Sequence, residues 1–83
     1  SCELTTGINA SVTSITINAA VSPYSNPPSS GRLVLADSTY NPTKFEIITY
    51  TGLTDNTTTL ILTGVTRGQE GTSGSTYRLS LLY

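Results

Sequence analysis

The segment from Arg67 to Thr72, Arg-Gly-Gln-Glu-Gly-Thr, is the one stretch of the sequence whose residue types and spacing form a motif. The glycines at Gly68 and Gly71 allow the backbone to adopt positive φ twice, and Arg67 and Glu70 are placed to pair across the turn. A phosphate-binding loop would follow a strand and lead into a helix with a Lys-Ser/Thr pair, and neither is present. We therefore interpret Arg67, Gly68, Glu70 and Gly71 as a structural turn, with anion binding as the weaker alternative.

The five carboxylates are the remaining candidates for acid–base chemistry. Asp37 with Asp55, or Glu46 with Glu70, could act as a general acid and base, but the members of each pair lie in different segments and nothing predicts a shared pocket. Asp37 precedes a turn and Asp55 lies inside one, where carboxylates accept hydrogen bonds from backbone N–H groups. The carboxylates therefore favour turn formation over catalysis.

The sequence contains no histidine and a single cysteine, Cys2. These two facts remove the commonest transition-metal ligand sets and any Ser-His or Cys-His nucleophile pair. No spaced Asp/Asn loop ending in Glu indicates calcium. We predict no enzymatic activity, no metal and no cofactor, and we expect Cys2 to be a reduced, inert side chain suited to assembly inside a cell.

Five tyrosines could form a surface that stacks on sugars, because tyrosine combines a flat apolar face with a polar tip. In a threonine-rich β-protein, half-buried strand positions are the more common place for tyrosine. Tyr24 and Tyr40 fall in expected loops and are candidate contact residues. Tyr83, at the end of the sequence, is a third candidate for an interface.

Length and charge exclude several other classes of function. The 83 residues have room for one domain, 1–83, with one small core. A net charge of −1 with four scattered basic residues cannot neutralise a phosphate track, so we expect no nucleic-acid partner. No apolar run is long enough to cross a bilayer, so we expect no membrane partner. A core this small without a disulfide favours oligomerisation or docking on a larger body.

The composition indicates an all-β protein, because sixteen threonines and eleven serines leave few helix-forming residues. Short stretches of alternating polarity separated by Gly/Pro turns predict a small antiparallel β-barrel or β-sandwich of about five to seven short strands. The proline-rich stretch 21–31 is expected to be a surface loop, and residues 1–10 an extended N-terminal arm. The expected strands are Ser11–Ala19, Arg32–Ala36, Lys44–Thr51, Thr58–Thr63 and Tyr77–Tyr83.

Two strands carry the clearest expectations. In Ser11–Ala19, alternation places Ile15 and Ile17 on the buried face. In Lys44–Thr51, one face carries Phe45, Ile47 and Thr49, and the other carries Glu46, Ile48 and Tyr50. We expect the Phe45 face to join the core and the Glu46 face to be amphipathic enough to meet a partner. The turn-rich segment after this strand predicts an antiparallel hairpin with Thr58–Thr63.

These segments, taken together over roughly residues 14–72, resemble a small β-module common in the virion proteins of tailed bacteriophages. The pairing of Glu-Ile-Ile-Thr-Tyr-Thr-Gly with Thr-Arg-Gly-Gln-Glu-Gly-Thr at this spacing is the most specific part of the resemblance, and it is not specific to one role. The residues that carry it are Gly31–Leu35, Phe45–Gly52, Leu60–Val65 and Thr66–Thr72.

The resemblance implies a structural role in the virion. A free-standing β-module of this size is similar to capsid decoration (cement) proteins, which sit on the shell as oligomers and bridge neighbouring subunits. We therefore expect a homo-oligomer with a partner in the major capsid protein or another virion subunit. A trimer suits the three-fold sites of a shell, but no residue dictates that number. We expect a place on the capsid surface in preference to the tail, after assembly in the host cytoplasm. The alternative is a tail fibre or tail adaptor module involved in host attachment, with glycan contacts through Tyr24 and Tyr40.

Overall fold

The protein is all-β, as the sequence predicts. The computed structural model describes residues 2–20, 25–38, 40–78 and 81–82, and these contain eight strands and no helix. Six of the strands have four or more residues, within the expected five to seven, and the other two have only two residues each. The strands are β1 Cys2–Glu3, β2 Ile15–Asn18, β3 Gly31–Ala36, β4 Phe45–Tyr50, β5 Gly52–Asp55, β6 Thr59–Thr63, β7 Thr66–Gln69 and β8 Leu81–Leu82.

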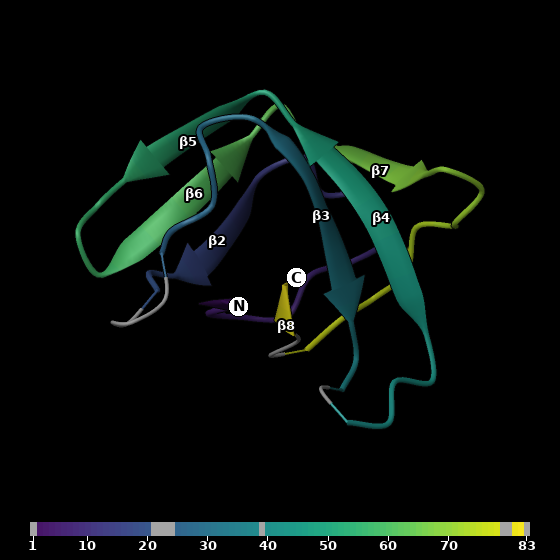
Figure 1. The fold of residues 1–83 in the computed structure, drawn as a ribbon. Coiled ribbons are helices and arrows are strands. Elements are labelled where there is room, and N and C mark those ends of the chain that lie inside the picture. Colours follow the sequence, from purple (N-terminus) through teal and green to yellow (C-terminus); the bar gives the residue numbers. More distant parts are fainter. Residues whose placement is uncertain (1, 21–24, 39, 79–80, 83) are drawn as a thin grey trace.

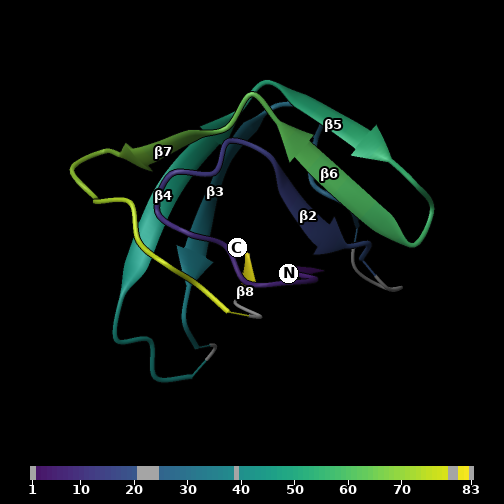
Figure 2. The same ribbon diagram turned by 180° about the vertical axis from the view of Figure 1, so that it is seen from behind.

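The strands form two antiparallel sheets that enclose the core between them (Figures 1 and 2). The five-stranded sheet has the order β1-β8-β3-β4-β7, and the three-stranded sheet has the order β2-β6-β5. A single bridge between Leu4 and Ile17 links the edges of the sheets on one side. The arrangement is that of the expected sandwich, without the continuous hydrogen-bonded ladder of a closed barrel.

One long hairpin passes through both sheets. β4 and β5 are separated only by Thr51, and β6 and β7 only by Gly64 and Val65, so the chain turns the corner between the sheets twice. The Thr51 N–H donates to the Thr63 carbonyl at 3.1 Å, which holds the corner together. Gly64 has a φ of 61°, and a Cβ there would clash with the Thr51 side chain, so this corner requires glycine.

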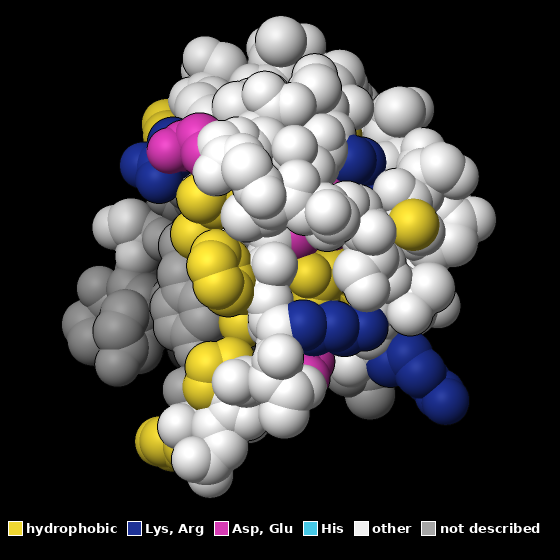
Figure 3. Space-filling model, turned by 90° about the vertical axis from the view of Figure 1, so that its right-hand side faces the viewer, with side chains coloured by type: hydrophobic (Ala, Val, Ile, Leu, Met, Phe, Trp, Pro, Cys, Tyr) yellow, Lys and Arg dark blue, Asp and Glu magenta, His cyan; other side chains and the backbone are white. Residues whose placement is uncertain are grey.

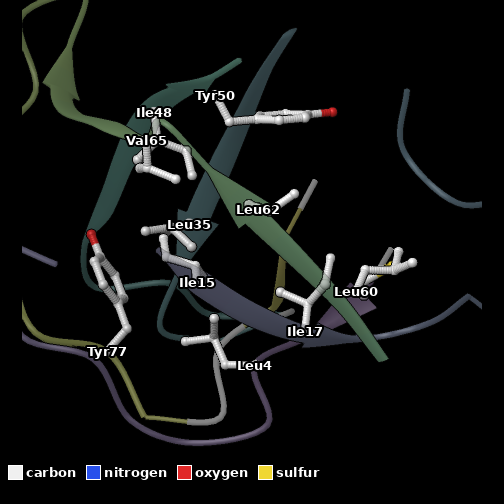
Figure 4. Packing of buried hydrophobic residues seen from close by; sticks show 11 residues of the cluster. Leu4, Ile15, Ile17, Leu35, Ile48, Tyr50, Leu60, Leu62, Val65 and Tyr77 are labelled. Carbon is white, nitrogen blue, oxygen red and sulfur yellow. The ribbon is translucent and has the colours of Figure 1, made fainter. Parts of the chain in front are cut away.

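The inner faces of the sheets form one apolar cluster (Figure 4). Ile15 and Ile17 are fully buried on β2, which confirms the alternation predicted for this strand. Thr16, between them, is half-buried on the other face. The cluster consists of Cys2, Leu4, Ile15, Ile17, Leu35, Ile48, Tyr50, Leu60, Leu62, Val65 and Tyr77.

The prediction for the two faces of Lys44–Thr51 is wrong. Ile48 and Tyr50 are buried together with Glu46, which has no exposed surface, whereas Phe45 is 58% exposed. The two faces carry similar apolar content, so alternation alone does not decide between them. The Glu46 face lies inside because an arginine from β7 neutralises the carboxylate there, as described below.

The first residues of the chain do not form the expected N-terminal arm. β1 pairs with β8, so that Cys2 lies opposite Leu82 in the five-stranded sheet. Leu4 is 1% exposed, and Ile8 forms a bridge with Tyr77. This segment is therefore attached to the sandwich at both ends, because Cys2 and Glu3 pair with β8 and Ile8 pairs with Tyr77.

The hairpin predicted between Lys44–Thr51 and Thr58–Thr63 is wrong. Part of the segment expected to turn, Gly52–Asp55, is strand β5, and β6 pairs with β5 while β4 pairs with β3 and β7.

The proline-rich loop is confirmed where it is described. Residues 25–30 form no strand, and residues 21–24 of the expected loop lie outside the described part of the chain. In the C-terminal segment the described strand is limited to Leu81–Leu82. Among the residues that the structure describes, none belongs to a helix long and apolar enough to cross a membrane.

Candidate functional site

A buried ion pair between Glu46 and Arg67 joins the two motifs that sequence analysis singled out. Arg67 Nε lies 2.7 Å from Glu46 Oε2, and Arg67 Nη2 lies 2.9 Å from Glu46 Oε1. The Glu46 side chain has no exposed surface, and that of Arg67 is 8% exposed. This parallel, two-bond geometry is the strongest form of arginine–carboxylate pairing.

Two backbone N–H groups complete the surroundings of Glu46. Gly68 N donates to Oε2 at 2.8 Å, and Ser75 N donates to Oε1 at 3.0 Å. Burial by itself would raise the pKa of Glu46, but the hydrogen bonds from Arg67, Gly68 and Ser75 outweigh it and hold the pKa below its usual value. The carboxylate is therefore ionised at neutral pH and has no free position for a substrate proton.

The rest of the Arg67 guanidinium reaches two further segments. Nη1 donates to the Asn9 carbonyl at 2.7 Å and to the Val12 carbonyl at 3.4 Å, and Nη2 donates to the Ser75 carbonyl at 2.7 Å. Together with the two bonds to Glu46, all five N–H donors of the guanidinium have acceptors. The pair thus ties β4 and β7 to residues 9–12 and to residue 75. We call this set, Glu46 and Arg67 with their backbone partners, the buried latch.

The latch corrects the pairing expected within the Arg67–Thr72 motif. Arg67 does not pair with Glu70, because its side chain points into the core toward Glu46. Glu70 pairs instead with Arg32 of β3, with 2.6 Å between Oε2 and Nε. Both of these side chains are more than half exposed, at 59% for Arg32 and 52% for Glu70. Glu46 and Glu70 therefore share no pocket in which one could act as acid and the other as base.

Only the second half of the predicted turn lies outside a strand: Arg67 and Gly68 belong to β7, and the turn follows at Glu70 and Gly71. Gly68 has a φ of 61° and Gly71 a φ of 85°, and Glu70 between them also has a positive φ of 54°. The Thr72 hydroxyl donates to the Gln69 carbonyl at 2.6 Å and accepts from the Ile47 N–H at 3.0 Å. The motif turn is thus fixed against β4, and its polar groups are used within the chain.

Tyr77 lies beside the latch with an unusual hydroxyl group. Its ring is buried, Lys44 Nζ lies 4.8 Å from the ring centroid, and its hydroxyl has no hydrogen-bond partner among the described residues. Burial, followed by the negative charge of Glu46, raises the pKa of Tyr77 to about 12. Lys44 Nζ also donates to the Ser75 hydroxyl at 3.1 Å. Tyr77 is therefore neutral and is held as a core residue under a lysine.

The two aspartates form turns, as the sequence predicts. Asp37 accepts from the Thr43 N–H at 2.8 Å and also from the Thr43 hydroxyl, and these bonds lower its pKa. Asp55 accepts from the Thr57 N–H at 2.8 Å and supports the positive φ of 73° at that residue. Among the described residues, no three or more His, Cys, Asp or Glu side chains form a group that could hold a metal ion.

The outer face of the five-stranded sheet is the second feature of functional interest. Ladder register places Val34 beside Ile47, and Ile47 beside Gln69, on this face. Phe45 is 58% exposed, and Val34 and Ile47 are each half-buried. We call Val34, Phe45 and Ile47 the apolar outer face. Figure 3 looks onto the side of the molecule that carries β4 and β7, where hydrophobic side chains run next to a basic and an acidic side chain.

The candidate contact tyrosines are placed only in part. Tyr40 is 90% exposed in the loop between β3 and β4, while Tyr24 and Tyr83 lie outside the described residues. Tyr50 and Tyr77 belong to the core, and the Tyr50 hydroxyl donates to the Pro28 carbonyl at 2.6 Å. Cys2 is buried, and burial raises the pKa of its thiol, which disfavours the reactive thiolate.

The sequence matches no protein-family model, and no curated protein or solved structure is similar to it at a significant level.

Sequence reasoning found the two ends of the latch without recognising that they meet. Glu46 and Arg67 are 21 positions apart. The sequence analysis does not predict that the strand Lys44–Thr51 pairs with the segment that contains Arg67. The available signal was a carboxylate on a strand whose two faces are otherwise equally apolar. Such a carboxylate can lie inside only with a cationic partner, and the sequence has four candidates for it.

Proposed function

We propose that this chain is a non-enzymatic structural protein of a bacteriophage virion, and that it acts as a capsid decoration (cement) protein bridging subunits on the shell surface. Its partners would then be the major capsid protein and further copies of the chain, brought together in the host cytoplasm. The observation that carries the proposal is the apolar outer face, Val34, Phe45 and Ile47, on a domain whose charged core groups are all engaged.

The buried latch supports a structural role for the motif pair that resembles phage virion modules. Glu46 comes from the first motif and Arg67 from the second, and each has its hydrogen-bonding capacity filled by the other and by the backbone. Residues in this state bind no substrate and transfer no proton, but they connect four segments of the chain. A module built in this way keeps its shape while its surface contacts other subunits.

The apolar outer face supports docking against protein. Phe45 is 58% exposed on a regular strand, and Val34 and Ile47 lie on the same face. Covering this apolar surface with a partner protein would lower the free energy of the system. The low content of charged residues, 11% of the chain, also suits a surface that becomes covered in an assembly. Both features fit a protein that reinforces a shell through many modest contacts.

Particle stability tests this proposal. Capsids stripped of the protein should rupture at a lower temperature than complete particles, and adding back the wild-type chain should restore the rupture temperature. The Phe45→Glu variant should restore it poorly, because a charge is placed on the apolar outer face. Thr54→Glu, which adds the same charge at an exposed position of the three-stranded sheet, is the matched control. Unchanged rupture on removal of the protein would contradict the proposal.

One observation favours the alternative role in a tail fibre or tail adaptor. Tyr40 is 90% exposed, which is the arrangement an aromatic ring needs to stack on a sugar of a host glycan. Immunogold labelling of intact virions separates the two roles. Label over the head supports decoration of the capsid, and label confined to the tail supports the alternative.

A further inference from the structure

The apolar outer face has a defined charged rim. Arg32 on β3 and Glu70 after β7 form an ion pair 2.6 Å long, although β4 lies between their two strands in the sheet. The pair therefore reaches across β4 on the outer side of the sheet. Arg32 lies opposite Thr49 in the ladder, one step along the face from the Val34 and Ile47 pair.

This rim is self-complementary. It carries one positive and one negative group side by side, each about half exposed, so it neither attracts nor repels a strongly charged partner as a whole. In a contact with two-fold symmetry, residue i meets residue j, and j meets i, so that Arg32 of one copy can face Glu70 of the other in both halves. The net charge of the chain, −1, does not oppose the approach of a second copy.

We propose that the apolar outer face binds the same face of a second copy of this chain, so that two five-stranded sheets stack about a two-fold axis. Phe45 of each copy supplies the aromatic anchor, and Val34 and Ile47 supply the surrounding apolar contact. The Arg32 and Glu70 side chains form the rim and exchange or share partners between the copies. Stacking of sheet faces is an established mode of β-packing, with about 10 Å between the sheets.

The inference rests on the proposed function in one respect: both assume that another protein chain covers the apolar outer face. It names the occupant of that face, which leaves other surfaces of the chain for contacts with the capsid. The isolated protein is sufficient to test it, since the face lies wholly within one chain.

Sedimentation velocity over a range of concentrations is the first test. The wild-type chain should sediment as a dimer at high concentration, and Phe45→Glu should weaken the dimer at least ~30-fold, as expected for a central aromatic anchor. Thr54→Glu should sediment like the wild type. Phe45 is exposed in the single chain, so the variant should fold, which a far-UV circular dichroism spectrum would verify. A monomer at every concentration, a trimer, or a dimer insensitive to Phe45→Glu would overturn the proposal.

Charge exchange at the rim is the second test, and it leaves the apolar residues unchanged. Arg32→Glu and Glu70→Arg should each weaken the dimer by up to ~5-fold per pair, because like charges then meet across the two-fold axis. The double variant restores one group of each sign and should recover most of the loss. A double variant weaker than either single variant would overturn the assignment of this rim to the interface.

The self-association and the role in the virion can fail separately. If the wild type stays monomeric and Phe45→Glu restores stripped capsids poorly, the self-association is wrong and the capsid proposal stands, with the apolar outer face on the capsid. If the wild type dimerises through Phe45 but never binds capsids, the two-fold contact stands and the proposed function is wrong.

Discussion

Two ion pairs of this protein have the same chemistry and opposite surroundings. Glu46 and Arg67 are buried and fully hydrogen-bonded, whereas Arg32 and Glu70 are about half exposed. Arg67 and Glu70 come from the same short motif, so the chain directs one charge inward and the other outward within four residues. The N–O distances are nearly equal, 2.7 Å and 2.6 Å, so we expect the burial of the partners to decide what each ion pair contributes. The inner pair joins segments of the fold, and the outer pair is available to a partner.

Removal of one member of the inner pair is expected to have the largest effect. Arg67→Ala leaves the Glu46 carboxylate buried without a counter-charge. It also removes the hydrogen-bond donor from three backbone carbonyls, those of Asn9, Val12 and Ser75. The free energy of unfolding should fall by ~3–5 kcal/mol. Urea denaturation followed by circular dichroism measures this loss. Arg67→Lys, which keeps the charge but not the planar donors, should also be clearly destabilised. Stability close to that of the wild type in both variants would contradict the structural role of the latch.

Acid should weaken the inner pair. The pKa of Glu46 is lower in the folded chain than in the unfolded chain, where it is about 4.3. Its contribution to stability is therefore complete above the unfolded value and is lost as the pH falls through the lower folded value. Urea midpoints measured from neutral pH downward should fall steeply below about pH 4.

Two variants identify the carboxylates behind this acid dependence. Asp37 also has a lowered pKa, so Asp37→Asn should remove a part of the dependence and leave the part that belongs to Glu46. Glu70→Gln serves as the control in the exposed pair. An unfolding free energy that stays level down to pH 2 would show that the Glu46 carboxylate is not held in its charged form.

The turn that separates the two pairs is expected to have an intermediate effect. Gly68→Ala places a Cβ 3.2 Å from backbone atoms of Thr72 and Gly74, at a φ of 61°. The strain should cost ~1–3 kcal/mol of unfolding free energy. Gly71 also has a positive φ but no atom within 4 Å of a Cβ, so Gly71→Ala should cost less. Equal losses in the two variants would show that the close contact at Gly68 adds nothing to the strain.

The outer pair should contribute least to the stability of the single chain. Arg32→Ala should change the free energy of unfolding by no more than about 1 kcal/mol, and the difference should shrink at high salt because the charges are exposed. Measurements below the concentration of self-association keep the two effects apart. A loss as large as that of Arg67→Ala would remove the distinction between the pairs.

The sequence predicts the parts of this fold that depend on local pattern. The alternation around Ile15 and Ile17, the all-β class and the aspartate turns follow from side-chain spacing and turn chemistry. The hairpin predicted between Lys44–Thr51 and Thr58–Thr63 does not, because β6 pairs with β5 and β4 pairs with β3 and β7. The phase of β4 could not be decided in this way, because Phe45 and Ile47 are balanced by Ile48 and Tyr50. It is determined by the contact between Glu46 and Arg67, which only the three-dimensional arrangement reveals.

The pairing of the chain ends was missed for a similar physical reason. β1 and β8 have two residues each, too few for alternation to be detected, and each gains its stability from a neighbour distant in sequence. The predicted pairing of Arg67 with Glu70 is wrong although the two residues are close in sequence and opposite in charge. Their side chains point to opposite sides of the sheet, and each pairs with a residue from another strand. In the candidate site, the residues were found and the partners were not.

The pairing of Cys2 with Leu82 brings the chain in and out of the domain at the same place, since the two strands are antiparallel neighbours (Figure 1). A domain whose first and last strands are neighbours can be inserted into a surface loop of another protein through short spacers, because the insertion does not move the two ends of that loop apart. This domain is therefore suited to insertion into a loop of a larger protein.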